Sequence, residues 1–125
     1  MESTWQELHT NKFDQAITFY RQAFNCDIRE VSSRFNSRYA LVISKDEQKP
    51  IAGIIESHLS CGWNSYIAVN NLIDTLTLAM SLGATNIQPF EIPKIGSAVV
   101  LHDANGQELS LIEFENNNLL KKIVA

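Results

Sequence analysis

The chain has 125 residues, of which 45% are hydrophobic and 19% are charged. This length and balance favour one compact domain and exclude a disordered or fibrous chain. No apolar stretch approaches the ~20 residues that span a bilayer, so we expect no membrane partner. The net charge of −4 and the lack of a basic stripe disfavour nucleic acid as a partner.

The beginning of the sequence and the cysteines indicate a cellular location. Met1 to Glu7 contain neither the basic nor the apolar region of a secretory signal. Cys26 and Cys61 have no metal-binding or C-x-x-C spacing, and a single disulfide between them stays open. We expect a cytoplasmic protein with reduced thiols.

The first half of the chain predicts a strand, a helix and three further strands. Apolar residues recur at helical spacing from Phe13 to Phe24, with Asn11 as the expected N-cap and Asn25 as the expected stop. Polar turns separate the other segments. The strands are expected over residues 4–10, 28–31, 39–44 and 50–57.

The second half repeats this pattern. A shift of 59 residues places Leu8 on Ile67 and Ile17 on Leu76. A helix is expected from Leu72 to Gly83, and a hairpin turn at residues 103–106. The remaining segments are strands over residues 65–69, 86–92, 97–102 and 108–114, and a terminal helix within residues 116–125.

These elements predict an α+β protein made of two βαβββ modules, one at about residues 1–60 and the other at about 61–115. A single module cannot cover both faces of its sheet. We therefore expect one cupped, eight-stranded mixed sheet with the helices on its outer face. The concave inner face is the expected binding pocket.

The order and spacing of short motifs across residues 4–114 resemble the vicinal oxygen chelate superfamily. That superfamily includes glyoxalase I, bleomycin- and fosfomycin-resistance proteins and extradiol dioxygenases. The matching segments are WQEL at residues 5–8, ITFY at 17–20, AGI at 52–54, WNSYIAV at 63–69, LGA at 82–84, DANG at 103–106 and LSLIE at 109–113. The resemblance implies a homodimer, and it is less specific for an activity than for the fold.

The resemblance also implies four metal-ligand positions, one on the first and one on the last strand of each module. In register these are Trp5, Glu56, Asn64 and Ser110. Only Glu56 is a good ligand, and an indole cannot ligate a metal. The pattern is therefore similar to metal-free relatives, and we expect no metal and no other cofactor.

A second group of residues offers an improvised site. Strand alternation predicts that Glu7 and His9 share a face, and that Glu56 and His58 share a face of a neighbouring strand. If both sets point into the pocket, they can form a metal site or an acid–base pair such as Glu7 with His58. We favour the structural interpretation, in which the carboxyl groups stabilise the sheet and the histidines lie at wet strand ends.

Aromatic residues have both a binding and a packing interpretation. Trp63 and Tyr66 can stack on a ligand, but aromatics on short strands are more often core residues. Phe19 and Tyr20 are expected to pack, and His102 is expected at the surface. Neither cysteine has the surroundings of a nucleophile.

The function that the sequence favours is a metal-free, glyoxalase-like protein that binds a small organic molecule as a homodimer, with drug or metabolite sequestration as a fitting role. Trp5 is expected to form a wall of its pocket. An amphipathic ligand with a cationic or hydrogen-bond-donating group would suit the carboxyl groups there. The expected lining is Trp5, Glu7, Glu56, Asn64, Tyr66 and Ser110.

Two other classes of function stay open at this stage. One is a metal-dependent lyase or isomerase that uses Glu56 with His9, His58 or Glu7 as improvised ligands. The other is an interaction module with a closed pocket. Metal analysis separates the enzyme from the binding protein, and pocket volume separates both from the interaction module.

Overall fold

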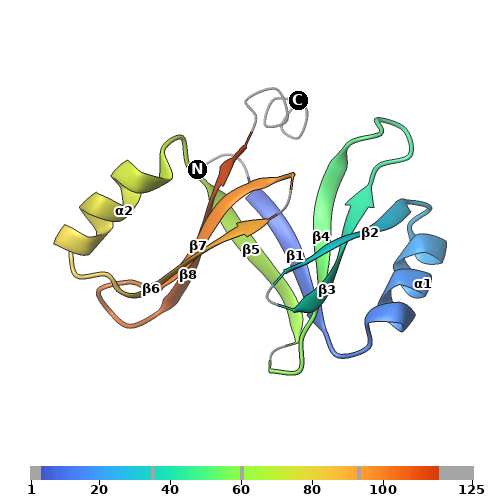
Figure 1. The fold of residues 1–125 in the computed structure, drawn as a ribbon, viewed down its shortest axis with the longest axis horizontal. Coiled ribbons are helices and arrows are strands. Elements are labelled where there is room, and N and C mark those ends of the chain that lie inside the picture. Colours follow the sequence, from blue (N-terminus) through green and yellow to red (C-terminus); the bar gives the residue numbers. More distant parts are fainter. Residues whose placement is uncertain (1–3, 35, 60, 93, 116–125) are drawn as a thin grey trace. The chain divides into compact units, whose positions relative to one another are not determined.

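A computed structural model describes residues 4–34, 36–59, 61–92 and 94–115, and its elements follow the predicted order (Figure 1). The first repeat comprises β1 (Thr4–Thr10), α1 (Phe13–Ala23), β2 (Asp27–Arg34), β3 (Ser37–Ile43) and β4 (Pro50–Glu56). The second comprises β5 (Gly62–Ala68), α2 (Leu72–Ser81), β6 (Thr85–Ile92), β7 (Gly96–His102) and β8 (Glu108–Phe114). The prediction of an α+β fold with two βαβββ repeats is confirmed.

Eight strands form one mixed sheet in the order β2-β3-β4-β1-β5-β8-β7-β6. β1 runs parallel to β4, and β5 runs parallel to β8. The chain divides into two compact units, and the boundary falls inside β5. We call Trp5–Ser65 the N-terminal unit and Tyr66–Ala125, with Met1–Thr4, the C-terminal unit.

In the N-terminal unit, α1 packs against one face of its strands. Phe13 is buried at the start of the helix, and the partly buried Ile17 and Tyr20 follow on the same side. The Arg21 guanidinium also donates a hydrogen bond of 2.6 Å to the Ile28 carbonyl on β2. The strands, and the residue directly before β2, supply the rest of this core. These residues are Leu8, Cys26, Ile28, Ala40, Val42, Ala52 and Ile54.

In the C-terminal unit, side chains fix both the start of α2 and the β7–β8 turn. The Asn71 side chain accepts a hydrogen bond from the Asp74 N–H, and Glu113 of β8 accepts one of 2.7 Å from the Leu72 N–H. In the turn, Asp103 accepts hydrogen bonds from two following backbone N–H groups, and Gly106 has a φ of +83°. Both features match the predicted helix start and hairpin.

The observed bounds differ from the predictions mainly at element ends. α1 begins after Lys12, which has no side-chain cap, and Thr10 accepts a hydrogen bond from the Lys12 N–H. Asn11 is therefore not the N-cap. β2 is longer than expected, because its polar end still pairs with β3 where Arg34 lies opposite Ser37. The expected terminal helix lies outside the described residues. None of the described helices is long and apolar enough to cross a membrane.

Truncating the buried Ile54 should destabilise the fold. Its side chain is fully buried in the core beneath α1, so Ile54→Ala removes contacts and leaves a cavity. We expect a loss of about 2–5 kcal/mol in the free energy of unfolding, measured by urea denaturation. Leu59→Ala is the matched control, because Leu59 is 99% exposed and should change stability by only about 0.5 kcal/mol. Equal effects would contradict this assignment of the core.

Candidate functional site

β1 has two chemically different faces. Leu8 belongs to the core beneath α1, whereas Trp5, Glu7 and His9 alternate onto the opposite face. Trp5 and Glu7 are both fully buried. Among the described residues, Glu7 is the only acidic or basic residue that is buried. A buried carboxyl group requires partners, so its surroundings define the candidate site.

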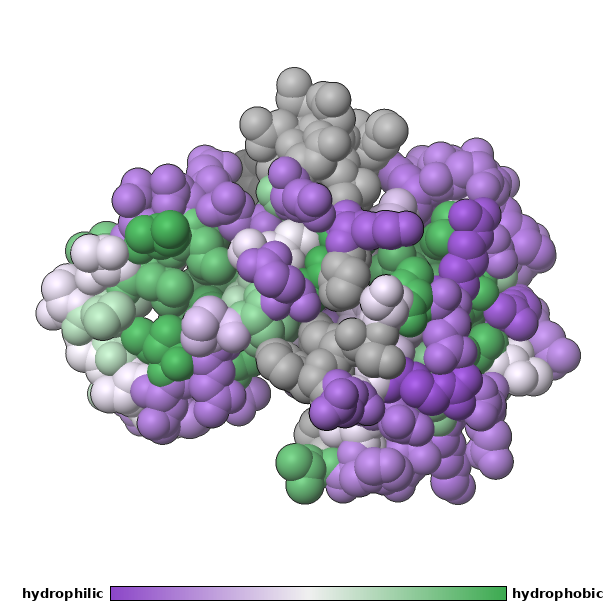
Figure 2. Space-filling view, viewed as in Figure 1, coloured by the Kyte–Doolittle hydropathy of each residue, from purple (hydrophilic) through white to green (hydrophobic). Residues whose placement is uncertain are grey.

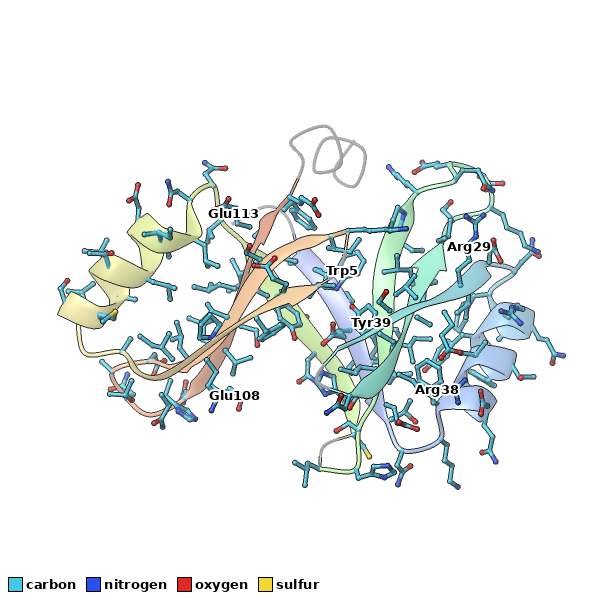
Figure 3. The ribbon with its side chains drawn as sticks, viewed as in Figure 1. Trp5, Arg29, Arg38, Tyr39, Glu108 and Glu113 are labelled. Carbon is cyan, nitrogen blue, oxygen red and sulfur yellow. The ribbon has the colours of Figure 1, made fainter. Side chains whose placement is uncertain are left out.

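The Tyr39 and His9 side chains hold the Glu7 carboxyl group. The Tyr39 hydroxyl on β3 donates a hydrogen bond of 2.7 Å to Oε2, and the His9 Nε2 atom lies 3.1 Å from Oε1. Tyr39 is fully buried, and Figure 3 shows it together with Trp5 in the N-terminal unit. The His9 side chain is 20% exposed. The network therefore connects a buried carboxyl group to the protein surface through an imidazole.

Gly53 on β4 makes the contact between Tyr39 and Glu7 possible. In the strand register, Gly53 lies beside Glu7 of β1 on one side and Leu41 of β3 on the other. A Cβ atom at this position would overlap with the Tyr39 hydroxyl and ring. The phenol thus crosses β4 through the space that only a glycine leaves.

The network can accept hydrogen bonds and relay a proton, but it offers few metal ligands. Glu7 and His9 are both ligand-type side chains, whereas the Tyr39 phenol already donates to the carboxyl group. Across the parts of the chain that the structure describes, no group of three or more His, Cys, Asp or Glu side chains is arranged to hold a metal ion.

The cluster of two glutamates and two histidines, which the sequence left open as the less favoured alternative, is not assembled on one face of the sheet. In the β1–β4 register, Gly53 lies opposite Glu7 and Ile55 lies opposite His9. Glu56 therefore shares the face of Ile54, on the side of α1. β4 ends at Glu56, and His58 is exposed in the bend that follows. The shared face depended on the register between the two strands, which one strand's alternation does not define.

Glu56 instead borders a polar pocket of about 300 Å³ at the start of α1, together with Asn11, Asp14 and Arg38. Arg38 makes paired hydrogen bonds to Asp14, and it also bonds Glu30 on β2. These hydrogen bonds lower the pKa of both carboxyl groups. The guanidinium also lies 4.6 Å from the centre of the Phe13 ring. The cluster is exposed, and the Arg38 guanidinium is already hydrogen-bonded to both carboxyl groups.

The pairing of the last strands changes one implied metal-ligand position. Leu8 pairs with Ile54 in the N-terminal unit, as Ile67 pairs with Leu111 in the C-terminal unit. One residue back along each last strand, Gly53 is therefore the equivalent of Ser110. The resemblance implied Glu56 at this metal-ligand position, but the strand pairing assigns the position to Gly53, which has no side chain.

The other predicted lining residues lie on β5 and β8. Asn64 is partly buried on β5, and Tyr66 follows two residues later on the same strand face. Tyr66 is buried and makes an edge-to-face contact with Phe90 on β6. Ile67 and Leu111 pack beside α2, so Tyr66 and Ser110 lie on the face opposite that helix.

The sequence did not single out Tyr39 or Gly53 as site residues. A glycine within a buried strand was the available signal, because it often marks a close approach by another group. The two cysteines are free, with Cys26 buried and Cys61 exposed.

Solved structures of other proteins share this arrangement of strands and helices. Among solved structures, the chain is similar to methylmalonyl-CoA epimerase from Mycobacterium tuberculosis, with a TM-score of 0.61, 16% identity, and coverage of 93% of this chain and 89% of that one. A Streptomyces coelicolor methylmalonyl-CoA epimerase in complex with 2-nitronate-propionyl-CoA gives a TM-score of 0.64, 12% identity, and coverage of 90% and 96%. The chain has the vicinal oxygen chelate fold.

Curated sequences agree with this fold. The chain is 26% identical over 113 residues to a protein named "Putative glyoxylase CFP32" in Mycobacterium tuberculosis and in Mycobacterium bovis. The match covers 87% of this chain but 42% of the relatives, so the chain spans less than half of their length. No family model matches the chain.

Adding one methyl group at Gly53 should break the Tyr39–Glu7 contact. Gly53→Ala places a Cβ atom against the Tyr39 hydroxyl, so we expect a loss of about 1–3 kcal/mol in the free energy of unfolding. Tyr39→Phe removes the hydroxyl and should by itself cost about 1–3 kcal/mol, because Glu7 loses a buried donor. The double variant should be more stable than the sum of the two losses predicts. Strict additivity in denaturant unfolding would contradict the geometry.

Proposed function

We propose that the protein binds a small organic molecule without a metal ion, and that the Glu7 carboxyl group is the recognition element. The buried Glu7, held by Tyr39 and reached from the surface through His9, is the observation that supports this proposal. The glyoxalase-like fold supports it further, because structural neighbours of this fold are named for small CoA-linked molecules.

The chemistry of the network determines the class of ligand. A carboxyl group in a buried setting favours a cationic or hydrogen-bond-donating partner, because such a partner compensates the lost hydration. Trp5 lies on the same face of β1 and offers an apolar ring to the rest of an amphipathic ligand. Asn64, Tyr66 and Ser110 stay proposed lining residues. Glu56 is omitted, because it lies on the side of α1.

The residues at the implied ligand positions support metal-free binding. Trp5, Asn64 and Ser110 stand at three of these positions, and strand pairing places Gly53 at the fourth. An indole and a glycine side chain supply no ligand atom, and an amide with a hydroxyl is a weak set for a transition metal.

The second candidate is a metal-dependent lyase or isomerase. It is favoured by the 3.1 Å approach of His9 to Glu7, two side chains of ligand type, and by the glyoxylase name of the curated relatives. In this case, the histidine and carboxyl group would have to open toward a metal, with the remaining ligands coming from substrate and water.

A thermal-shift screen of small organic amines, run in EDTA and with added Zn²⁺, Ni²⁺ or Mn²⁺, tests the two candidates. We expect stabilising compounds in EDTA, with about 2.7 kcal/mol of added stability at one hundred times the dissociation constant. Glu7→Gln should weaken their binding at least tenfold, because a hydrogen bond to a charged group contributes about 1.5–3 kcal/mol. The matched control, Glu56→Gln, changes the same group on the opposite face and should leave affinity unchanged.

Two results would contradict the proposal. One metal ion per chain by elemental analysis, together with compounds that bind only when metal is present, would favour the lyase or isomerase. Equal effects of Glu7→Gln and Glu56→Gln would remove Glu7 from the binding site.

We further propose that the protein is a homodimer. In the C-terminal unit, α2 and the residue that follows it expose large apolar side chains, and Figure 2 shows hydrophobic residues at the surface over this part of the chain. These residues are Ile73, Leu78, Met80 and Leu82. Large apolar side chains exposed over one short segment favour an interaction surface, and a second copy of the chain would cover part of them.

Sedimentation should therefore show a dimer at micromolar concentration. Leu78→Glu introduces a charge into this apolar set and should shift the protein toward the monomer. Leu59→Glu is the control, because Leu59 is also an exposed leucine but lies in the N-terminal unit. A wild-type monomer, or dissociation by both variants alike, would contradict the proposal.

A further inference from the structure

A second cavity lies in the N-terminal unit on the side of α1, opposite the face that holds Glu7. It has a volume of about 390 Å³ and lies between the end of α1, the start of β4 and the start of β5. Pockets for small molecules have volumes of about 300–1,000 Å³, so this cavity has sufficient size. None of its lining side chains is charged, and its aromatic wall consists of Tyr20, Phe24 and Trp63.

The aromatic wall has a defined geometry. The Tyr20 ring is stacked with Phe24, with ring centres 5.6 Å apart and planes at 17°. It meets Trp63 edge to face, at 5.6 Å and 86°. Phe24 is 66% exposed and Trp63 is 46% exposed, so two large rings border a cavity and still face water. A flat apolar molecule would cover them and gain favourable ring contacts.

One hydrogen-bonding group, the Tyr20 hydroxyl, lies in this apolar wall. The Trp63 Nε1–H donates to the Tyr20 hydroxyl oxygen at 3.2 Å. Among the described residues, the Tyr20 hydroxyl donates to no acceptor, so its own proton can be donated to a ligand. A carbonyl or ether oxygen on the ligand would accept it.

We propose that this cavity, which we call the aromatic pocket, binds a neutral, planar aromatic molecule that carries one hydrogen-bond acceptor. The uncharged lining disfavours a charged ligand, which would lose its hydration without gaining an ionic partner. The stacked and edge-on rings select a flat apolar ring system, and the Tyr20 hydroxyl orients it. This pocket is separate from the Glu7 network, because the two lie on opposite faces of the same strands.

The test uses prodan, a neutral naphthalene with a ketone acceptor whose emission reports polarity and hydrogen bonding. Titration of the full-length protein should give saturable binding of one prodan per chain. Tyr20→Phe removes only the hydroxyl and should weaken prodan binding about fivefold. The same variant should leave the binding of 2-dimethylaminonaphthalene unchanged, because that probe lacks the acceptor. Trp63→Leu removes the ring from the wall and should weaken both probes roughly tenfold.

Phe19→Leu is the matched control. Phe19 is an exposed ring on α1 that contacts Tyr20 edge to face at 5.1 Å, but it does not line the aromatic pocket. The Phe19→Leu variant should therefore bind both probes as the wild-type protein does.

Several outcomes would overturn the proposal. These are non-saturable binding of prodan, an effect of Phe19→Leu as large as that of Trp63→Leu, or equal loss of both probes in Tyr20→Phe. Tight binding of the anionic probe 1-anilinonaphthalene-8-sulfonate would show that the pocket does not select neutral molecules. Sedimentation completes the test: if Trp63→Leu dissociates a dimer, the rings belong to an interface between two copies instead.

Discussion

The hydrogen bond from Tyr39 to Glu7 determines the character of the face that α1 does not cover. It joins β3 to β1 across the intervening β4, and it requires a glycine at position 53. An unpaired buried carboxyl group would cost several kcal/mol, so Glu7 depends on the phenol as well as on His9. The phenol in turn depends on the space above Gly53. Three strands are thus locked into one arrangement around a single carboxyl group.

The same strands carry the opposite chemistry on their other face. Leu8 and Ile54 alternate with Glu7 and Gly53, and they form the apolar core beneath α1. The aromatic pocket opens on that side as well. Because neighbouring residues on a strand point to opposite faces, a shift of one residue exchanges core for site. The N-terminal unit can therefore hold a polar network and an apolar cavity without either disturbing the other.

Local patterns were enough to predict the repeat and most of the element bounds. Hydrophobic periodicity and the turn at residues 103–106 reflect interactions between residues close in sequence, and the predicted strands at residues 4–10 and 108–114 match β1 and β8. The face of Glu56 was not predictable in this way. It depends on the parallel pairing of β1 with β4, whose partners are 46 residues apart at Gln6 and Ala52 (52 − 6). The Tyr39–Glu7 contact spans 32 residues and had no local signal.

Comparison of the two repeats separates what the fold requires from what the site requires. The paired positions of Leu8 and Ile67 make Tyr66 the equivalent of Glu7. Tyr66 is also buried, but it packs against the Phe90 ring and introduces no carboxyl group. The βαβββ repeat therefore forms with an aromatic residue at this position, and nothing in its strand pairing demands a glutamate. Glu7 carries a desolvation penalty that its equivalent avoids, so the fold alone does not account for a carboxyl group at this position.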